Sequence, residues 1–130
     1  MRAPLSAIRS GRRAAVAKMI DECRVTRKAG VADEITGVTP TTVVYEGRAL
    51  SQTYEAWEQT PEAGGHSYTV QRYSVHFPWD GFVPQVDDVV EWTDCPLSPE
   101  RVGTRERITS PFDKTFHTAL RVPTDRLAEG

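Results

Sequence analysis

Residues 41–50 are Thr-Thr-Val-Val-Tyr-Glu-Gly-Arg-Ala-Leu, and this stretch decides the fold. Its β-branched and aromatic side chains fit a pleated, half-buried surface, so the stretch predicts a strand. Gly47 lies inside the run, where a glycine indicates either a bulge or a close backbone approach. A single strand is not stable alone, so other parts of the chain must supply strands that pair with it.

Further short strands are predicted on both sides of it, because apolar and polar residues alternate in them as in a half-buried strand. They cover residues 23–27, 67–77, 86–93, 102–109 and 116–122. The last two form a plausible hairpin. Many short antiparallel strands usually close into a barrel or stack as a sandwich, since open sheet edges aggregate. We therefore predict a mainly β fold, a small closed antiparallel β-barrel of about six strands over residues 22–122.

An N-terminal α-helix is predicted over residues 4–20. Apolar side chains recur there at helical spacing and define one face: Leu5, Ile8, Ala15, Val16, Met19 and Ile20. Arg9 and Arg13 fall opposite this face, whereas Arg12 falls on or near it, so its stem can pack while its head reaches out. At 130 residues the chain is the size of one domain, 1–130, with the helix placed over one end or side of the barrel.

Two long loops are predicted, at residues 29–40 and 51–66. The first contains two glycines, Pro40 and an acidic pair, and the second is polar and acidic. Within the second, residues 54–57 could instead form one helical turn.

Charge is divided unevenly along the chain. Residues 1–28 contain eight basic and two acidic residues, whereas the remainder contains eight basic and sixteen acidic residues. Such a subunit suits head-to-tail stacking or an acidic partner. The alternative is a solvated basic helix beside an acidic barrel.

Residues with reactive side chains form no recognisable catalytic pattern. Cys23 and Cys95 lie far apart and are interpreted as buried apolar thiols. A Cys95–His76 dyad lacks an activating local motif, and Asp87-Asp88 is interpreted as a turn before a strand. We expect no enzyme and no catalytic, cofactor or metal site. No apolar run is long enough for a membrane span, and no secretory signal is expected.

Four stretches, in this order and spacing, resemble small proteins of actinobacterial phages that are grouped with head–tail connector and stopper proteins. They are residues 21–27 directly after the helix, residues 41–48, residues 75–78 with 86–90, and residues 102–105 with 116–122. Asp87 stands where that family usually has glycine. Thirteen arginines against three lysines, with no asparagine, agree with a GC-rich host.

The resemblance implies a structural virion protein of the phage neck, assembled in the host cytoplasm. Such subunits form a homo-oligomeric ring, a hexamer or dodecamer, with portal or adaptor proteins above and tail proteins below. The ring closes the channel after DNA packaging, so packaged DNA lies near its lumen, and no cofactor is needed.

The expected contacts of such a ring are the two loops and the basic helix. Tyr54 and Trp57 are candidate anchors because aromatic residues dominate interface energetics, and Arg9, Arg12 and Arg13 are candidate partner contacts. Two other functions remain open: a tail-completion subunit, and a small oligonucleotide-binding β-barrel module. The second is disfavoured because the aromatic residues lie in the acidic part of the chain while the basic residues lie on the helix.

Overall fold

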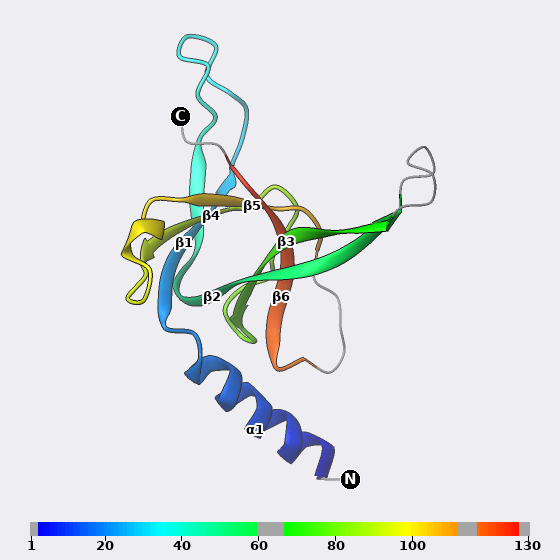
Figure 1. The fold of residues 1–130 in the computed structure, drawn as a ribbon. Helices are drawn as coiled ribbons and strands as arrows, with labels where there is room; N and C mark the ends of the chain where they lie inside the picture. The colour runs from blue at the N-terminus through cyan, green and yellow to red at the C-terminus, as the bar shows by residue number, and fades with distance from the viewer. Residues whose placement is uncertain (1–2, 60–66, 112–116, 128–130) are drawn as a thin grey trace.

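Figure 1 shows a computed structural model of the chain, which describes residues 3–59, 67–111 and 117–127. One helix precedes six strands: α1 (Ala3–Ala17), β1 (Asp21–Lys28), β2 (Thr41–Gln59), β3 (Ser67–Pro78), β4 (Val89–Asp94), β5 (Arg105–Ile108) and β6 (Ala119–Arg126). A short 3-10 helix, Pro99–Arg101, lies between β4 and β5. All the strand pairs are antiparallel, in the order β1-β2-β3-β6-β5-β4, and β4 pairs with β1 to close the barrel. The predicted fold class is confirmed.

The barrel interior is filled by alternate side chains of each strand. In β4, Val90 and Trp92 are buried, whereas Val89, Glu91 and Thr93 lie at the surface or half-buried. The same alternation across the other strands gives one core: Cys23, Val25, Ala49, Val75, Phe77, Val90, Trp92, Cys95, Ile108, Leu120 and Val122. Both cysteines are free thiols inside it, as predicted. Burial on this scale is the main favourable contribution to folding.

The prediction of a loop over residues 51–66 is largely wrong. Residues 51–59 continue β2 without a break and pair with residues 67–75 of β3, so they form neither a loop nor a helical turn. Residues 54–59 and 67–72 extend past the part of β3 that pairs with β6, and they project from the barrel as a two-stranded arm (Figure 1). The antiparallel ladder satisfies the backbone hydrogen bonds of this polar stretch, which composition alone could not show. Residues 60–66 of the predicted loop lie outside the described residues.

Two smaller predictions also change, and the structure decides between the two alternatives for Gly47. The helix ends at Ala17 instead of residue 20, because Met19 turns into the core and Asp21 already belongs to β1. Strand β6 continues beyond Pro123 to Arg126. The register shift between β1 and β2 lies at Val25/Thr26 and not at Gly47. Gly47 instead accommodates a close approach, since a Cβ there would lie 3.0 Å from the hydroxyl of Tyr45.

The turn before β4 separates the two acidic residues Asp87 and Asp88. Asp88 is buried and holds the guanidinium of Arg27 through two hydrogen bonds of 2.8 Å each. Asp87 is exposed, faces Arg107 at 2.6 Å, and has a φ of 75°, the left-handed region that glycine favours. Asp and Asn adopt this region more readily than other residues with a Cβ. The turn thus has a glycine-like backbone at Asp87 although this residue carries a side chain.

Candidate functional site

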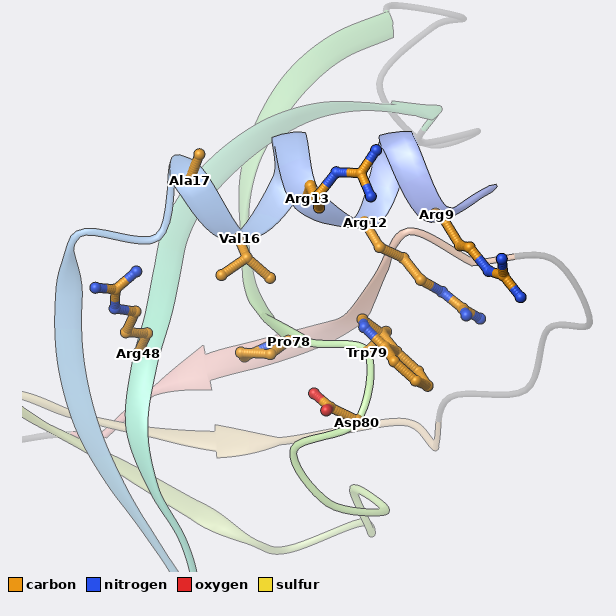
Figure 2. Close-up of a pocket in the computed structure, with 9 residues that line it drawn as sticks. All are labelled: Arg9, Arg12, Arg13, Val16, Ala17, Arg48, Pro78, Trp79 and Asp80. Carbon is orange, nitrogen blue, oxygen red and sulfur yellow. The ribbon is translucent and has the colours of Figure 1, made fainter. Parts of the chain in front are cut away.

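A groove lined by arginines separates α1 from one end of the barrel (Figure 2). Its volume is about 830 Å³, within the usual range of ligand pockets. We call it the arginine groove, and it is lined by Arg9, Arg12, Arg13, Val16, Ala17, Arg48, Pro78, Trp79 and Asp80. All three predicted arginines of the helix therefore lie at one site.

Arg12 is the most tightly held of these arginines. Its guanidinium lies over the ring of Trp79, 4.0 Å from the ring centroid, and its Nε donates a 3.1 Å hydrogen bond to the backbone carbonyl of His117. Figure 2 shows Arg9 and Arg12 extending from α1 on the Trp79 side, with Arg48 of β2 at the other end of the groove. Cation–π stacking and a backbone hydrogen bond orient the Arg12 guanidinium before any partner arrives. The prediction that the head of Arg12 reaches outward differs from this position, because the guanidinium stacks on Trp79 and bonds to the backbone of the barrel.

The position of α1 depends on a glycine. A Cβ at Gly11 would lie 2.6 Å from the Cγ2 methyl of Thr118, just before β6, so the helix can come this close only because residue 11 has no side chain. Among the described helix side chains, residues 5–17, none is buried, and Leu5 is 53% exposed. The helix therefore rests on the barrel lightly and leaves apolar surface uncovered.

The charge of the groove is strongly positive. Four arginines line it against one carboxylate, Asp80. In the part of the chain that the structure describes, none of the four forms an ion pair, although Arg13 reaches Ser10 at 3.3 Å. Uncompensated cations beside apolar Val16, Ala17 and Pro78 suit an acidic segment that also carries aliphatic side chains.

A second prominent feature is the predicted loop at residues 29–40, which we call the finger. It joins β1 to β2 and extends from the end of the barrel opposite α1 (Figure 1). Internal hydrogen bonds shape it. The Asp33 carboxylate accepts the amide of Ile35 at 2.7 Å, and the Asp33 carbonyl accepts the amide of Gly37 at 2.7 Å. At its base the amide of Ala29 donates to the Pro40 carbonyl at 2.8 Å.

The finger displays aliphatic side chains to solvent. Val31, Ile35 and Val38 are 89%, 94% and 64% exposed. Because three exposed aliphatic side chains gather on one projection, the finger is a candidate contact surface.

The predicted aromatic anchors lie elsewhere. Tyr54 and Trp57 belong to the arm, where their backbones pair with Arg72 and Thr69. The predicted role of their side chains lies outside what the structure describes. The arm, to which both belong, contributes no described side chain to the lining of the arginine groove.

The groove also contains two residues that the sequence did not single out for it. Arg48 comes from β2, and Trp79 follows β3, so both are distant in the sequence from the helix that they face. Trp79 corrects the expected separation of aromatic from basic residues, because this aromatic ring stacks on Arg12. The signal in the sequence was a tryptophan within the Pro78–Gly81 turn, where a large aromatic residue has no neighbouring strand pattern to bury it.

The candidate catalytic groups show no activation. Burial raises the pKa of the Cys95 thiol, only partly offset by the cationic Arg101, which is opposite to what a nucleophilic thiolate needs. Cys23, deeper in the core, has its pKa raised by burial to about 12. Burial, together with Arg121, lowers the pKa of His76. Across residues 3–59, 67–111 and 117–127, no group of three or more His, Cys, Asp or Glu side chains is placed to hold a metal ion. His66, another of the three histidines of the chain, lies outside the described residues.

None of the described helices is long and apolar enough to cross a membrane.

Comparison with known families places the chain in one of them. Residues 11–125 match the model of a family of unknown function, DUF6093, and the chain belongs to that family. No curated protein matches the chain. No solved structure matches it either.

Proposed function

We propose that this chain is a non-catalytic structural subunit of the phage neck, a head–tail connector or stopper. It would form a homo-oligomeric ring that closes the portal channel after DNA packaging and docks the tail. Its site of action would be the assembled virion, between portal or adaptor proteins and tail proteins.

The observation that carries the proposal is the placement of contact surfaces on a closed barrel. The barrel is completed by β4 pairing with β1, so each strand has a paired neighbour on both sides within the barrel, whereas in the arm β2 and β3 pair only with each other. Three projections leave it: α1 with the arginine groove, the finger, and the arm. A stiff body with several projecting contact elements is typical of a subunit that works by assembly. The resemblance of four sequence stretches to connector proteins supports the same function.

The test is quantification of the chain in purified particles. Particles of the source phage are purified, and the chain is measured against the portal protein by mass spectrometry. We expect a few copies per particle in a simple ratio to the portal. Its absence from particles would overturn the proposal. Enrichment in detached tails and not in filled heads would favour a tail-completion subunit.

A second function, oligonucleotide binding, is favoured by one observation, the stacked pair Arg12–Trp79 in a positively charged groove. Aromatic rings beside arginines are the usual platform for single strands. Filter binding with a single-stranded oligonucleotide across a salt titration tests it. A true binder loses affinity steeply as salt rises, whereas a connector subunit should show only weak binding.

A further inference from the structure

The finger and α1, which lines the arginine groove, lie at opposite ends of the barrel (Figure 1), and the chemistry of the finger and the groove is complementary. The finger carries two acidic residues, Asp33 and Glu34, and no basic residue. The groove carries four arginines and one carboxylate. Opposite charges therefore face outward at the two ends of one molecule.

The apolar parts of the two surfaces also correspond. The finger presents Val31, Ile35 and Val38 around its acidic pair. The groove presents Val16, Ala17 and Pro78 between its arginines. Both surfaces thus mix aliphatic and charged groups, and burying aliphatic side chains while opposite charges meet is the usual basis of a specific contact.

We propose that the finger of one copy of this chain docks in the arginine groove of a second copy. Ile35, at the hydrogen-bonded turn of the finger, would lie against the apolar lining. Glu34 would face Arg9 and Arg13, which are exposed and have no ion pair among the described residues. The inference rests on the proposed ring-forming function, since it names the two surfaces that would form the ring.

This contact is heterologous, because each copy contributes a different surface. Repeating it closes a ring if the rotation between copies closes, and gives a filament if it does not. A single finger buries little area, so one contact is weak and ring closure strengthens it by linking several.

The test uses two variants of the full chain, each lacking one surface. The finger variant is Glu34→Lys with Ile35→Ser, and the groove variant is Arg9→Glu with Arg13→Glu. All four positions are exposed, so both variants should fold, which circular dichroism and thermal unfolding check. Each variant alone should remain monomeric by sedimentation velocity, while the wild-type chain associates as its concentration rises.

The decisive measurement mixes the two variants. The finger variant, labelled with ¹⁵N, keeps an intact groove, and the unlabelled groove variant supplies an intact finger. We expect amide shift changes at residues 9–17, 48 and 79–80 of the labelled chain, with a 1:1 complex that grows no further. The matched control adds unlabelled finger variant, which should change nothing.

Charge restoration gives a second readout. Glu34→Lys alone should weaken the association of the wild-type chain about tenfold or more, since like charges then meet in the contact. Mixing a Glu34→Lys chain with an Arg9→Glu chain should recover a large part of that loss. If Ile35→Ser or Glu34→Lys leaves self-association unchanged, the finger is not the occupant of the groove.

Three outcomes separate this inference from its rivals. No shift at the groove in the mixture, up to millimolar protein, overturns the contact while leaving the particle experiment to judge the neck function. If an oligonucleotide shifts the groove resonances and the groove variant, which carries an intact finger, does not, the finger–groove contact is overturned. The groove would then be a nucleic-acid site. A confirmed contact in a chain absent from particles would leave the assembly inference intact and remove the neck function.

Discussion

At the scale of single residues, Glu106 places a carboxylate inside the barrel. Glu106 of β5 is fully buried and accepts two hydrogen bonds, from Trp92 Nε1 at 2.6 Å and from the Thr124 hydroxyl at 2.7 Å. These bonds link β4, β5 and β6 through one side chain. A buried polar group is tolerated when its hydrogen bonds are made, and it is costly when they are broken.

Glu106→Ala should therefore destabilise the chain by about 3 kcal/mol, because it leaves two buried donors without an acceptor and opens a cavity. Glu106→Gln keeps one acceptor and should cost less. Urea unfolding measures both. Glu22→Ala, on the exposed side of β1, is the matched control and should change stability little. A loss in Glu106→Ala no larger than in this control would contradict the role assigned to Glu106.

His76 makes the stability depend on pH. It is half-buried on β3 opposite Arg121 of β6, and burial, then Arg121, lower its pKa from the ordinary value of 6.5. As pH falls below 6.5, the unfolded chain takes up a proton that the folded chain resists, so stability should fall there and recover above it.

NMR titration of the His76 ring and urea unfolding across the same pH range measure the effect. Arg121→Gln removes the cationic neighbour and should move the pKa of His76 upward. His76→Gln should remove this part of the pH dependence. A pH profile that does not change in His76→Gln would assign it to other groups.

At the scale of elements, the docking of α1 requires a close approach of Gly11 to Thr118. Alanine is intrinsically better than glycine in a helix interior by ~1 kcal/mol. The structure reverses the expected benefit of Gly11→Ala, because the new Cβ would meet the Thr118 methyl at 2.6 Å. Helix propensity and tertiary packing therefore oppose each other at this position.

Gly11→Ala should consequently push α1 away from the barrel and loosen the Arg12–Trp79 stack, while the barrel stays folded. The Trp79 indole resonance in a ¹H–¹⁵N spectrum reports the contact directly. Adding Thr118→Ser removes the methyl and should return the resonance toward its wild-type position. If Gly11→Ala alone leaves that resonance unchanged, the helix is not held where the structure places it.

At the scale of the whole molecule, the barrel and the helix contribute differently to stability. The barrel contains the core, and its six strands form a complete ring of hydrogen-bonded pairs. None of the described side chains of α1 is buried. The helix thus serves to build the arginine groove more than to stabilise the fold.

Removal of residues 1–17 should leave a cooperatively folding barrel and abolish the groove. Met19 and β1 remain in this truncated chain, so its core is complete. Far-ultraviolet circular dichroism should retain the strand signal, and urea unfolding should remain a single transition with stability lowered by only about 1–2 kcal/mol. Loss of cooperative unfolding would show that the helix is part of the core after all.

The sequence by itself determined the class of fold and most of the core. The alternation in residues 23–27 and 86–93 is local information, because successive side chains of a strand point to opposite faces whatever the partner strand is. The helical spacing predicted over residues 4–20 is local for the same reason, although the helix itself ends at Ala17. Glu106 has the spacing to Ile108 of an inward-facing residue, but charged side chains are rarely buried unless paired, so the pattern alone does not place it in the core.

Only the tertiary structure decided how the surfaces are combined. Barrel closure brings Arg48 and Trp79 beside a helix that begins at Ala3, and it pairs residues 51–59 with β3, turning a predicted loop into an arm. Contacts between residues so far apart depend on strand order and register, which periodicity does not encode. The requirement for glycine at position 11 likewise comes from the tertiary structure, because the methyl group that a Cβ would meet belongs to Thr118, far away in the sequence.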